Sequence, residues 1–243
     1  MKDRIVPMEW ESEFLPWFKS RWEPGQHVGL IAPTGAGKTT LASGILDHCR
    51  KYVLALDAKG GDTTLATLGY PRLDRWPGMK RISSMVEENE KNNLPSRWIV
   101  GSSNRTLDEA QKLITVLKTT LDDAWSMGNW TLYADELQLL TDPRLMGLRE
   151  EVDRLLIAAR DRGISFMASF QAPKWVSPTA YQQASHLAVS YTQDDDVVKR
   201  LAEVLGRDKN EVRGVFKGLD KFAWVIVGRD PREPYRVTIP ARR

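Results

Sequence analysis

Three things that the sequence lacks limit what the chain can be. It has one cysteine, Cys49, among 243 residues, so no internal disulfide can form, and the apolar helical pattern around Cys49 is typical of a packed thiol. No apolar run approaches the roughly 18 residues that a membrane helix needs, and there is no secretory hydrophobic segment. The formal net charge is only +3, so any nucleic-acid surface must be local. We expect a cytoplasmic protein without a membrane segment.

The remaining composition, 42% apolar and 28% charged, is that of a soluble globular protein long enough for one large domain. Apolar runs alternate with amphipathic helical patterns, which predicts an α/β fold with a mostly parallel sheet flanked by helices. The predicted strands are residues 27–31, 52–56, 98–100, 130–134, 164–170 and 186–190, and a C-terminal β-hairpin pairs 222–227 with 235–239. The predicted helices are 39–50, 106–128, 149–162 and 196–205.

We predict a single domain over residues 1–243 with three parts. Residues 1–26 form an N-terminal cap, because Trp10, Trp17 and Trp22 cluster there around a short amphipathic helix that Pro16 limits or breaks. Residues 27–206 form the core, and residues 207–243 form a C-terminal helix and the hairpin. The polar residues 71–97 predict an irregular surface excursion with at most a helical turn.

Residues 28–40, VGLIAPTGAGKTT, have the layout of a P-loop, in which a buried strand leads through glycines into a helix. Glycines let the backbone curl so that its N–H groups converge on a phosphate, and the helix N-terminus attracts the same anion. Lys38 can reach the β- and γ-phosphates of ATP, and the Thr39 hydroxyl can ligate Mg²⁺. The predicted nucleotide-binding residues are Pro33, Thr34, Gly35, Ala36, Gly37, Lys38, Thr39 and Thr40.

Asp135 and Glu136 directly follow the apolar strand WTLYA. A carboxylate at the tip of a buried strand, downstream of a P-loop, fits Mg²⁺ ligation by Asp135. The adjacent Glu136 then fits a base that polarises the attacking water, which argues against a small-molecule kinase because a kinase gains nothing from activating water. The alternative interpretation is a pair of exposed acids that begins a loop.

A third set of motifs separates families of P-loop proteins. Residues 159–164 read ARDRGI, and residues 169–173 read SFQAP after the next apolar strand. In this order and spacing the chain resembles the FtsK/HerA superfamily of DNA-pumping ATPases, whose members carry A-R-x-x-G-I and then Q-x-P. Residues 57–60, DAKG, are similar to the D-P-K-G turn of the superfamily, with Ala58 in place of proline. The resemblance implies a RecA-like P-loop NTPase core.

The resemblance also implies roles for single residues. Gln171 matches the polar sensor of the γ-phosphate, although a simple strand-end turn is the alternative. Arg160 matches an arginine finger that reaches the nucleotide of a neighbouring subunit, and such a finger implies a homo-oligomeric ring, a pentamer or hexamer. The alternative, a cation at a helix C-terminus, applies equally to Arg162. The predicted catalytic residues are Lys38, Glu136, Arg160 and Gln171.

Pumps of this kind grip the phosphate backbone of double-stranded DNA with basic groups on loops. The candidates are Lys59 in the DAKG turn, Lys80 and Arg81 in the excursion, and Arg105 before the long helix. Lys59 is preferred because it follows a core strand. For each of the four, a solvated surface charge is the alternative interpretation.

Members of the superfamily that segregate chromosomes or couple conjugation usually carry membrane helices or long extra domains, which this sequence lacks. It therefore resembles the viral genome-packaging branch, whose motors dock on a capsid or portal component in the host cell cytoplasm. A plasmid or mobile-element DNA-transfer or segregation ATPase, and an ATP-binding scaffold that does not translocate DNA, are the alternatives.

Overall fold

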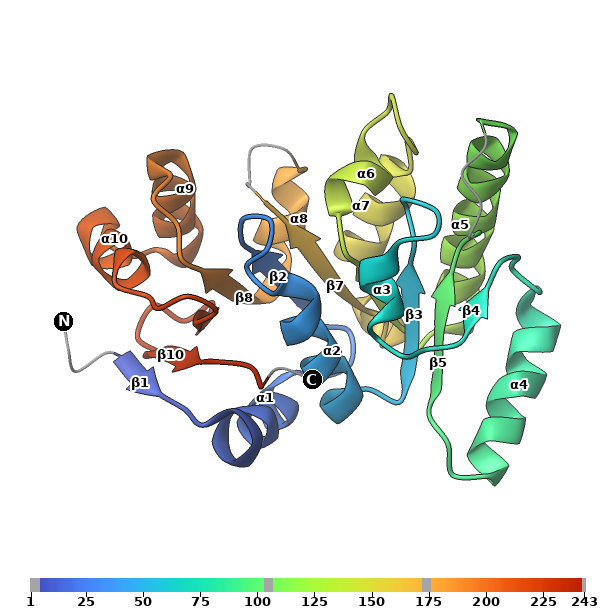
Figure 1. Cartoon of the computed structure of the whole chain (residues 1–243), viewed down its shortest axis with the longest axis horizontal. Helices are drawn as coiled ribbons and strands as arrows, with labels where there is room; N and C mark the ends of the chain where they lie inside the picture. The colour runs from blue at the N-terminus through green and yellow to red at the C-terminus, as the bar shows by residue number, and fades with distance from the viewer. Residues whose placement is uncertain (1–4, 103–106, 172–175, 242–243) are drawn as a thin grey trace.

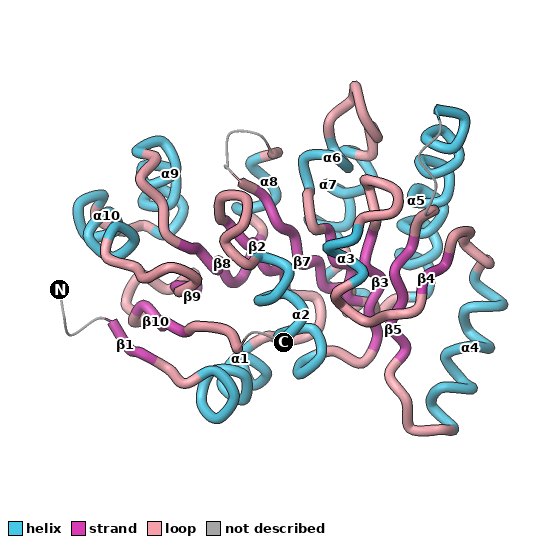
Figure 2. The backbone as a smooth tube through the Cα atoms, in the orientation of Figure 1, coloured by secondary structure: helices cyan, strands magenta, loops and turns pink. Residues whose placement is uncertain are grey.

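The structure is a computed structural model, and it describes residues 5–102, 107–171 and 176–241 (Figures 1 and 2). The strands are β1 (Ile5–Pro7), β2 (His27–Ile31), β3 (Tyr52–Leu56), β4 (Arg72–Leu73), β5 (Ser96–Val100), β6 (Thr131–Ala134), β7 (Ser165–Phe170), β8 (Ala184–Ser190), β9 (Trp224–Gly228) and β10 (Tyr235–Thr238). The α-helices are α1 (Leu15–Arg21), α2 (Lys38–Cys49), α3 (Thr63–Ala66), α4 (Met79–Lys91), α5 (Leu107–Met127), α6 (Leu137–Thr141), α7 (Arg149–Ala158), α8 (Pro178–Gln182), α9 (Asp195–Leu205) and α10 (Lys209–Lys217).

The described strands form one sheet in the order β1-β10-β9-β8-β2-β7-β6-β3-β5-β4. Pairing is parallel from β8 through β4, whereas β9 is antiparallel to both β8 and β10. The predicted mixed α/β class with a mostly parallel sheet and a C-terminal antiparallel pair is therefore confirmed. β1 adds a parallel strand beside β10 and forms one edge of the sheet, and β4 forms the other (Figure 1).

Alternation along the strands divides the core into two layers, one on each face of the sheet. Val53 and Ala55 of β3 pack with α1 and α2, whereas Leu54 and Leu56 pack on the opposite face with α5, α7 and α9. Because both faces are covered, the central strands are apolar throughout. This explains why each central strand is recognisable as a continuous apolar run in the sequence.

The N-terminal cap is a packed element, as its tryptophans predict. A π-helical segment (Trp10–Phe14) leads directly into α1, and Pro16 is tolerated because it lies in the first turn of that helix. The rings of Trp10, Phe14, Phe18 and Trp22 contact one another in sequence and are buried against α2. Arg50 ties the cap down, since its guanidinium stacks 3.8 Å from the Trp22 ring centroid and donates to the Trp22 carbonyl.

One prediction about the excursion was wrong. Residues 79–91 form the regular helix α4 and not an irregular loop, because Ile82, Met85 and Val86 recur at helical spacing and pack against the core. Ile82 is fully buried. The many charges of this segment lie on the outer side of the helix, and they obscured its apolar stripe in the sequence.

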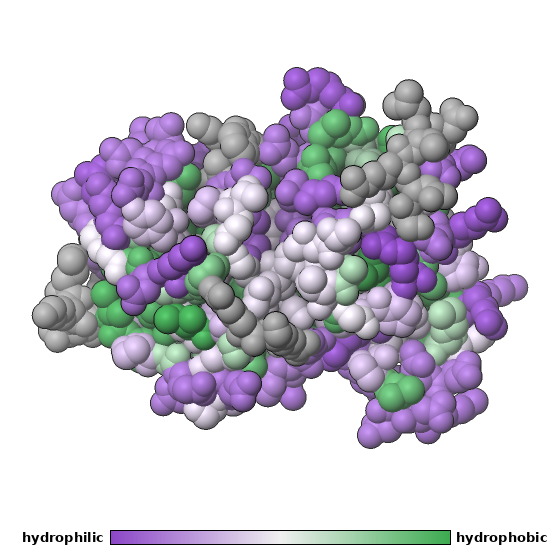
Figure 3. All heavy atoms as spheres, in the orientation of Figure 1, coloured by the Kyte–Doolittle hydropathy of each residue, from purple (hydrophilic) through white to green (hydrophobic). Residues whose placement is uncertain are grey.

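Apolar side chains also reach the surface over the terminal strands. Ile5, Val6 and Ile239 are among the exposed large hydrophobic residues. Figure 3 shows apolar atoms gathered on this part of the face, beside the polar helices α9 and α10. The same region borders the cavity described below.

His27, at the start of β2, is buried between β7 and α7 in a defined neutral form. Its Nδ1 accepts a hydrogen bond from the Phe166 N–H (3.0 Å), so its Nε2–H donates to the Leu156 carbonyl (3.1 Å). Burial lowers the pKa of His27 to about 4, and the nearby charge of Arg160 acts in the same direction.

We predict that this histidine makes stability pH-dependent. The unfolded chain protonates His27 near pH 6.5 and the folded chain only near pH 4, so stability is present above pH 6.5 and is lost as the pH falls toward 4. The loss from this group is about 3 kcal/mol at most. Urea unfolding at several pH values should show a flatter profile for His27→Gln than for the parent, while the exposed control His48→Gln keeps the parent slope. Parallel profiles for His27→Gln and the parent would contradict the assignment.

Candidate nucleotide-binding site

The sheet brings the predicted motifs together along the carboxyl ends of its strands, which we call the carboxyl edge. In the parallel register Ile31 pairs with Phe170, Ala134 with Ala168, and Leu56 with Ala134. The segments that follow β2, β7, β6 and β3 therefore all emerge on the same side, where ligands bind in open α/β sheets. These four segments carry the P-loop, Gln171, the Asp135–Glu136 pair and the DAKG turn.

The P-loop has the backbone that its glycines predict. Gly35 (φ +78°) and Gly37 (φ +87°) adopt left-handed conformations, and Gly37 forms the N-terminal boundary of α2. Lys38 is buried at the base of the loop, where its ammonium donates to the carbonyls of Ala32 (2.9 Å) and Pro33 (3.0 Å). Burial lowers the pKa of Lys38, and the charges of Asp135 and Glu136 oppose this shift.

The two predicted Mg²⁺ ligands are in direct contact. Thr39 Oγ1 donates to Asp135 Oδ1 over 3.0 Å, and both side chains are buried. The same Asp135 oxygen accepts a 2.5 Å hydrogen bond from the hydroxyl of Tyr133. Burial, followed by the neighbouring Asp135 charge, raises the pKa of Tyr133 well above its ordinary value, so this tyrosine is a permanent donor to the carboxylate.

These ligands suit Mg²⁺, which favours hard oxygen donors and is usually held by one or two carboxylates together with substrate phosphates. Thr39 and Asp135 would supply one hydroxyl and one carboxylate at the P-loop. Over the described ranges no group of three or more His, Cys, Asp or Glu residues is placed to form a dedicated metal cage. The arrangement therefore fits a metal that arrives with a nucleotide.

Glu136 follows Asp135 and begins the short helix α6. Its Oε1 lies 3.0 Å from Lys59 Nζ, and the same ammonium lies 3.1 Å from Asp62 Oδ2. Burial alone would lower the pKa of Lys59, but its hydrogen bonds to Glu136 and Asp62 together raise it. Lys59, the preferred candidate for DNA contact, is thus bound to the predicted catalytic base.

The turn that carries Lys59 is organised by Asp57, which is fully buried. Its carboxylate accepts hydrogen bonds from the N–H groups of Lys59 (3.1 Å), Gly60 (3.0 Å) and Asp62 (2.9 Å). Arg72 neutralises the buried charge at 2.7 Å. Asp57 therefore stabilises the turn through these hydrogen bonds. The turn places the Lys59 ammonium beside Glu136.

Gln171 lies between the P-loop and the Asp135 strand. The carbonyl of Phe170, the residue before it, accepts a hydrogen bond from the Ala32 N–H (3.3 Å), and β7 pairs with both β2 and β6. Gln171 therefore follows β7 at the position between the P-loop and the Asp135–Glu136 pair, and its role as a sensor of the γ-phosphate stays a prediction. Ala172 and Pro173, which complete the motif, lie outside the described residues.

Arg160 lies at the opposite ends of the strands from the P-loop, beside their amino-terminal ends. It belongs to a 3₁₀ turn (Arg160–Arg162) that precedes β7, and its backbone packs against Gly25, which precedes β2. The five residues of β2 separate this edge from the P-loop by roughly 17 Å. Arg160 is exposed, and its guanidinium makes no hydrogen bond or ion pair within the part of the chain that the structure describes. Arg162, in contrast, donates to the Trp125 carbonyl and stacks on the Trp125 ring.

The other candidates for DNA contact are dispersed. Lys80 and Arg81 are exposed on α4, near the β4 edge of the sheet (Figure 1). Arg105 lies outside the described residues. Lys80 and Arg81 lie beyond β4, whereas the nucleotide motifs follow β2, β7, β6 and β3, so contact of these cations with DNA stays a prediction.

Sequence reasoning missed Tyr133 and Arg72 as parts of the site. Tyr133 could have been found, because it lies two residues before Asp135 and residues two apart on a strand share a face. Arg72 could not, since it comes from β4, and only the packing of β4 beside β5 brings it to Asp57.

The fold and the site define a class: a P-loop NTPase core in which the phosphate-binding loop, an Asp–Glu strand end and a strand-end glutamine share one edge. No model of a known protein family matches the sequence, and no curated protein matches it. Solved structures do match the fold.

The DNA-packaging ATPase B204 from Sulfolobus Turreted Icosahedral Virus superposes with a TM-score of 0.62 at 18% identity, covering 91% of this chain and 100% of that chain. The genome packaging NTPase B204 from Sulfolobus turreted icosahedral virus 2, in complex with ATP-gammaS, gives 0.59 at 16% identity, with 90% and 99% covered. The pCW3 conjugation coupling protein TcpA with ATPgS gives 0.56 at 15% identity, with 89% and 61% covered. Identities this low establish a common fold only.

None of the helices in the described ranges combines the length and the apolar character needed to cross a bilayer.

We predict that Tyr133→Phe costs about 1.5–3 kcal/mol of unfolding free energy, since a buried hydrogen bond to a carboxylate is lost. The matched control is Tyr52→Phe, which removes the hydrogen bond from an exposed hydroxyl to Glu90 and should cost less than about 1 kcal/mol. Both values can be measured by urea unfolding. Equal losses in the two variants would show that the Tyr133 hydroxyl does not support Asp135 as described.

Proposed function

We propose that the chain is an ATPase that works as a ring of identical subunits and moves double-stranded DNA, with viral genome packaging as its role. The observation that carries the ATPase part is the Thr39–Asp135 contact at the base of a P-loop, with Glu136 as the next residue. Similar folds belong to proteins described as a DNA-packaging ATPase and as NTPases in complex with ATP analogues, which supports the same reading.

In this proposal each side chain has one task. The P-loop amides and Lys38 bind the phosphates, and Thr39 and Asp135 hold the Mg²⁺, which would neutralise charge on the β- and γ-phosphate oxygens. Tyr133 orients the Asp135 carboxylate through its hydrogen bond. Glu136 accepts a proton from the attacking water, and Gln171 hydrogen-bonds the γ-phosphate or that water.

Arg160 supplies the reason for a ring. It lies at the edge of the sheet opposite to its own P-loop, so its guanidinium can serve only the nucleotide of another subunit. A free, exposed arginine suits this task because its planar fork neutralises charge that develops on the transferred phosphoryl group. Arg162 is engaged with Trp125, so we favour Arg160 as the finger.

We predict complementation between two inactive variants. Arg160→Ala keeps an intact P-loop but lacks the finger, whereas Lys38→Ala lacks phosphate binding but keeps Arg160. Each alone should hydrolyse ATP at least about 10³-fold more slowly than the parent, because a trans finger is worth at least that much in rate. Mixed at a concentration that permits assembly, they should recover a measurable part of the parent's phosphate release.

Two controls make the complementation specific. Arg162→Ala should retain near-parent activity, and Glu136→Gln added to the Arg160→Ala chain should abolish recovery, because the hydrolysing subunit then lacks its base. Failure of the mixture to exceed the sum of its parts, with both variants folded, would refute the trans assignment. Hydrolysis by Glu136→Gln at the parent rate would refute the ATPase mechanism itself.

Lys59 couples DNA to hydrolysis in this proposal. Its ammonium holds Glu136 at 3.0 Å and is one-third exposed. A DNA phosphate that binds Lys59 competes with Glu136 for the same cation, so DNA binding frees the carboxylate to accept a proton. The basic charge near the site would thereby restrain hydrolysis until DNA is present.

We predict that double-stranded DNA raises the parent's ATPase rate, and that Lys59→Ala is faster without DNA but is stimulated less by it. Its DNA affinity should also vary less with salt, with the slope reduced by about 1 for one lost phosphate contact. Lys51→Ala, which removes an exposed lysine paired with Glu90, is the matched control and should behave as the parent. A slower rate for Lys59→Ala without DNA would instead mean that Lys59 assists the chemistry.

Transfer of DNA between cells is the second candidate role. Its support is the fold shared with TcpA, described as a conjugation coupling protein. We favour packaging because two B204 structures superpose with TM-scores of 0.62 and 0.59, compared with 0.56 for TcpA. A packaging motor would act in the host cytoplasm and dock on a capsid or portal component.

A further inference from the structure

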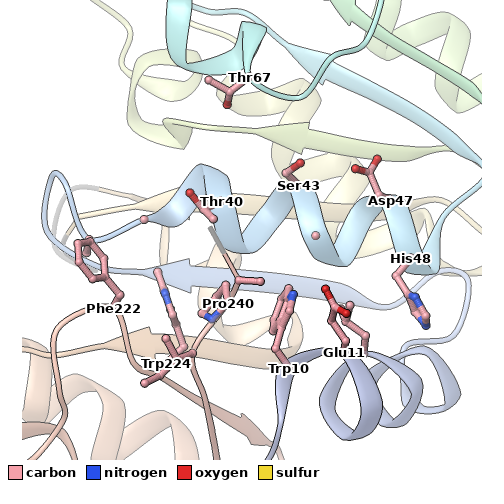
Figure 4. Close-up of a pocket in the computed structure, with 16 residues that line it drawn as sticks. Trp10, Glu11, Thr40, Ser43, Asp47, His48, Thr67, Phe222, Trp224 and Pro240 are labelled. Carbon is pink, nitrogen blue, oxygen red and sulfur yellow. The ribbon is translucent and has the colours of Figure 1, made fainter. Parts of the chain in front are cut away.

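A cavity of about 800 Å³ adjoins the P-loop on the outer side of α2. One end is formed by Ala36, Gly37 and Thr40 of the P-loop and first turn of α2, and by Phe222 from the segment that precedes β9. The other end reaches His48 and the N-terminal cap (Figure 4). A volume of this size is within the range of small-molecule sites in proteins.

The sheet order shows on which side of the P-loop the Phe222 end of the cavity lies. Asp135 follows β6, which is separated from β2 by β7 alone, whereas Phe222 and Trp224 belong to the β9 side, beyond β8. The P-loop thus lies between the Asp135–Glu136 pair and the Phe222 end of the cavity. A nucleotide whose terminal phosphate faces Asp135 must direct its ribose and base the opposite way, toward the cavity.

The lining next to the P-loop suits a flat ring. A methyl group built on Gly37 would lie 3.7 Å from Phe222 Cδ1, so the phenyl ring borders the loop itself. Trp224, Ile239 and Pro240 continue this wall with apolar side chains, and Figure 4 shows Phe222, Trp224 and Pro240 on the side of the cavity that faces Thr40. An apolar and aromatic wall binds a nucleobase by stacking on its π-face.

Phe222 is also held in an unfavourable backbone conformation. Its φ is +70°, in the left-handed region that bulky residues rarely adopt. An asparagine or glycine would meet this geometry at lower cost, so the sequence keeps an aromatic ring here against local preference. Strain of this kind concentrates at ligand sites, where the surrounding structure imposes it.

We propose that this end of the cavity is the subsite for the base of the bound nucleotide, with Phe222 as the stacking residue. The inference rests on the proposed ATP site and adds a part of the chain, the segment before β9, that none of the sequence motifs includes. Because stacking reads the face of a base and not its hydrogen-bonding edge, the subsite accepts adenine and guanine with similar affinity. It therefore does not distinguish ATP from GTP.

The test compares ligands with and without a base. Dissociation constants for MgATP, MgGTP and magnesium tripolyphosphate are measured by titration calorimetry on the parent, Phe222→Asn, Phe222→Tyr and the control Trp76→Ala. Asparagine suits the left-handed backbone, so the loop is retained while the ring is lost. Trp76 is an aromatic residue that donates to Asp123, far from the P-loop beside β4.

We expect Phe222→Asn to weaken both purine nucleotides by roughly 5- to 150-fold, the range for loss of one base–aromatic stack, and to leave tripolyphosphate binding unchanged. Phe222→Tyr and Trp76→Ala should bind as the parent does.

Unchanged ATP binding by Phe222→Asn would overturn the inference, and so would an equal loss for tripolyphosphate, which would make Phe222 a support of the P-loop. A parent that prefers ATP over GTP by more than 20-fold would overturn the stacking account. A parent that binds none of the three ligands would instead refute the proposed ATP site.

Discussion

Parallel pairing of β2, β7, β6 and β3 is the constraint on which the site depends. The in-register ladder aligns the carboxyl ends of these strands, so that segments up to about 140 residues apart in the chain emerge at one edge. The strands are buried on both faces, and the polar groups at their tips are positioned by the paired backbone of the sheet. The Thr39–Asp135 hydrogen bond is the direct product of this alignment.

Burial determines how each charged side chain at the carboxyl ends of the strands is stabilised. Asp57 is fully buried, and it is tolerated because three backbone N–H groups and Arg72 satisfy its carboxylate. Asp135 is stabilised by two hydroxyl donors, Thr39 and Tyr133. The remaining cation, Lys59, is partly exposed and bridges Glu136 to Asp62. The least buried ion pair is thus the one that contains the proposed base, and it is the pair that a ligand can rearrange most easily.

The carboxyl and amino ends of the strands differ in whether their charged side chains have partners within the chain. The carboxyl edge concentrates partnered polar groups, whereas the amino edge presents Arg160 without a partner among the described residues. The β9 side adds an apolar cavity wall next to the P-loop. A nucleotide placed by these features would contact the core through its phosphates, the C-terminal strands through its base, and a second chain through Arg160. This composite arrangement explains why no single motif describes the site.

The sequence alone determined the P-loop, the strand ends and their order, because those features depend on local backbone requirements: glycine at left-handed positions, continuous apolar runs, and polar residues where strands stop. It also predicted that Gln171 would lie beside the Asp135 strand, through the resemblance to a known family. It did not predict α4 as a regular helix. The apolar stripe around Ile82 is short and is surrounded by charged residues, and only its packing against the core identifies it.

Tertiary structure alone decided which partners the charges take. Lys59 was predicted to contact DNA because it follows a core strand, and the fold places its ammonium beside Glu136, which lies 77 residues further along the chain. The base-binding wall, with Phe222 against Gly37, likewise depends on how the last strands fold back beside β8. Contacts of this kind are set by sheet order and by the packing of distant segments, which local propensity and spacing do not encode.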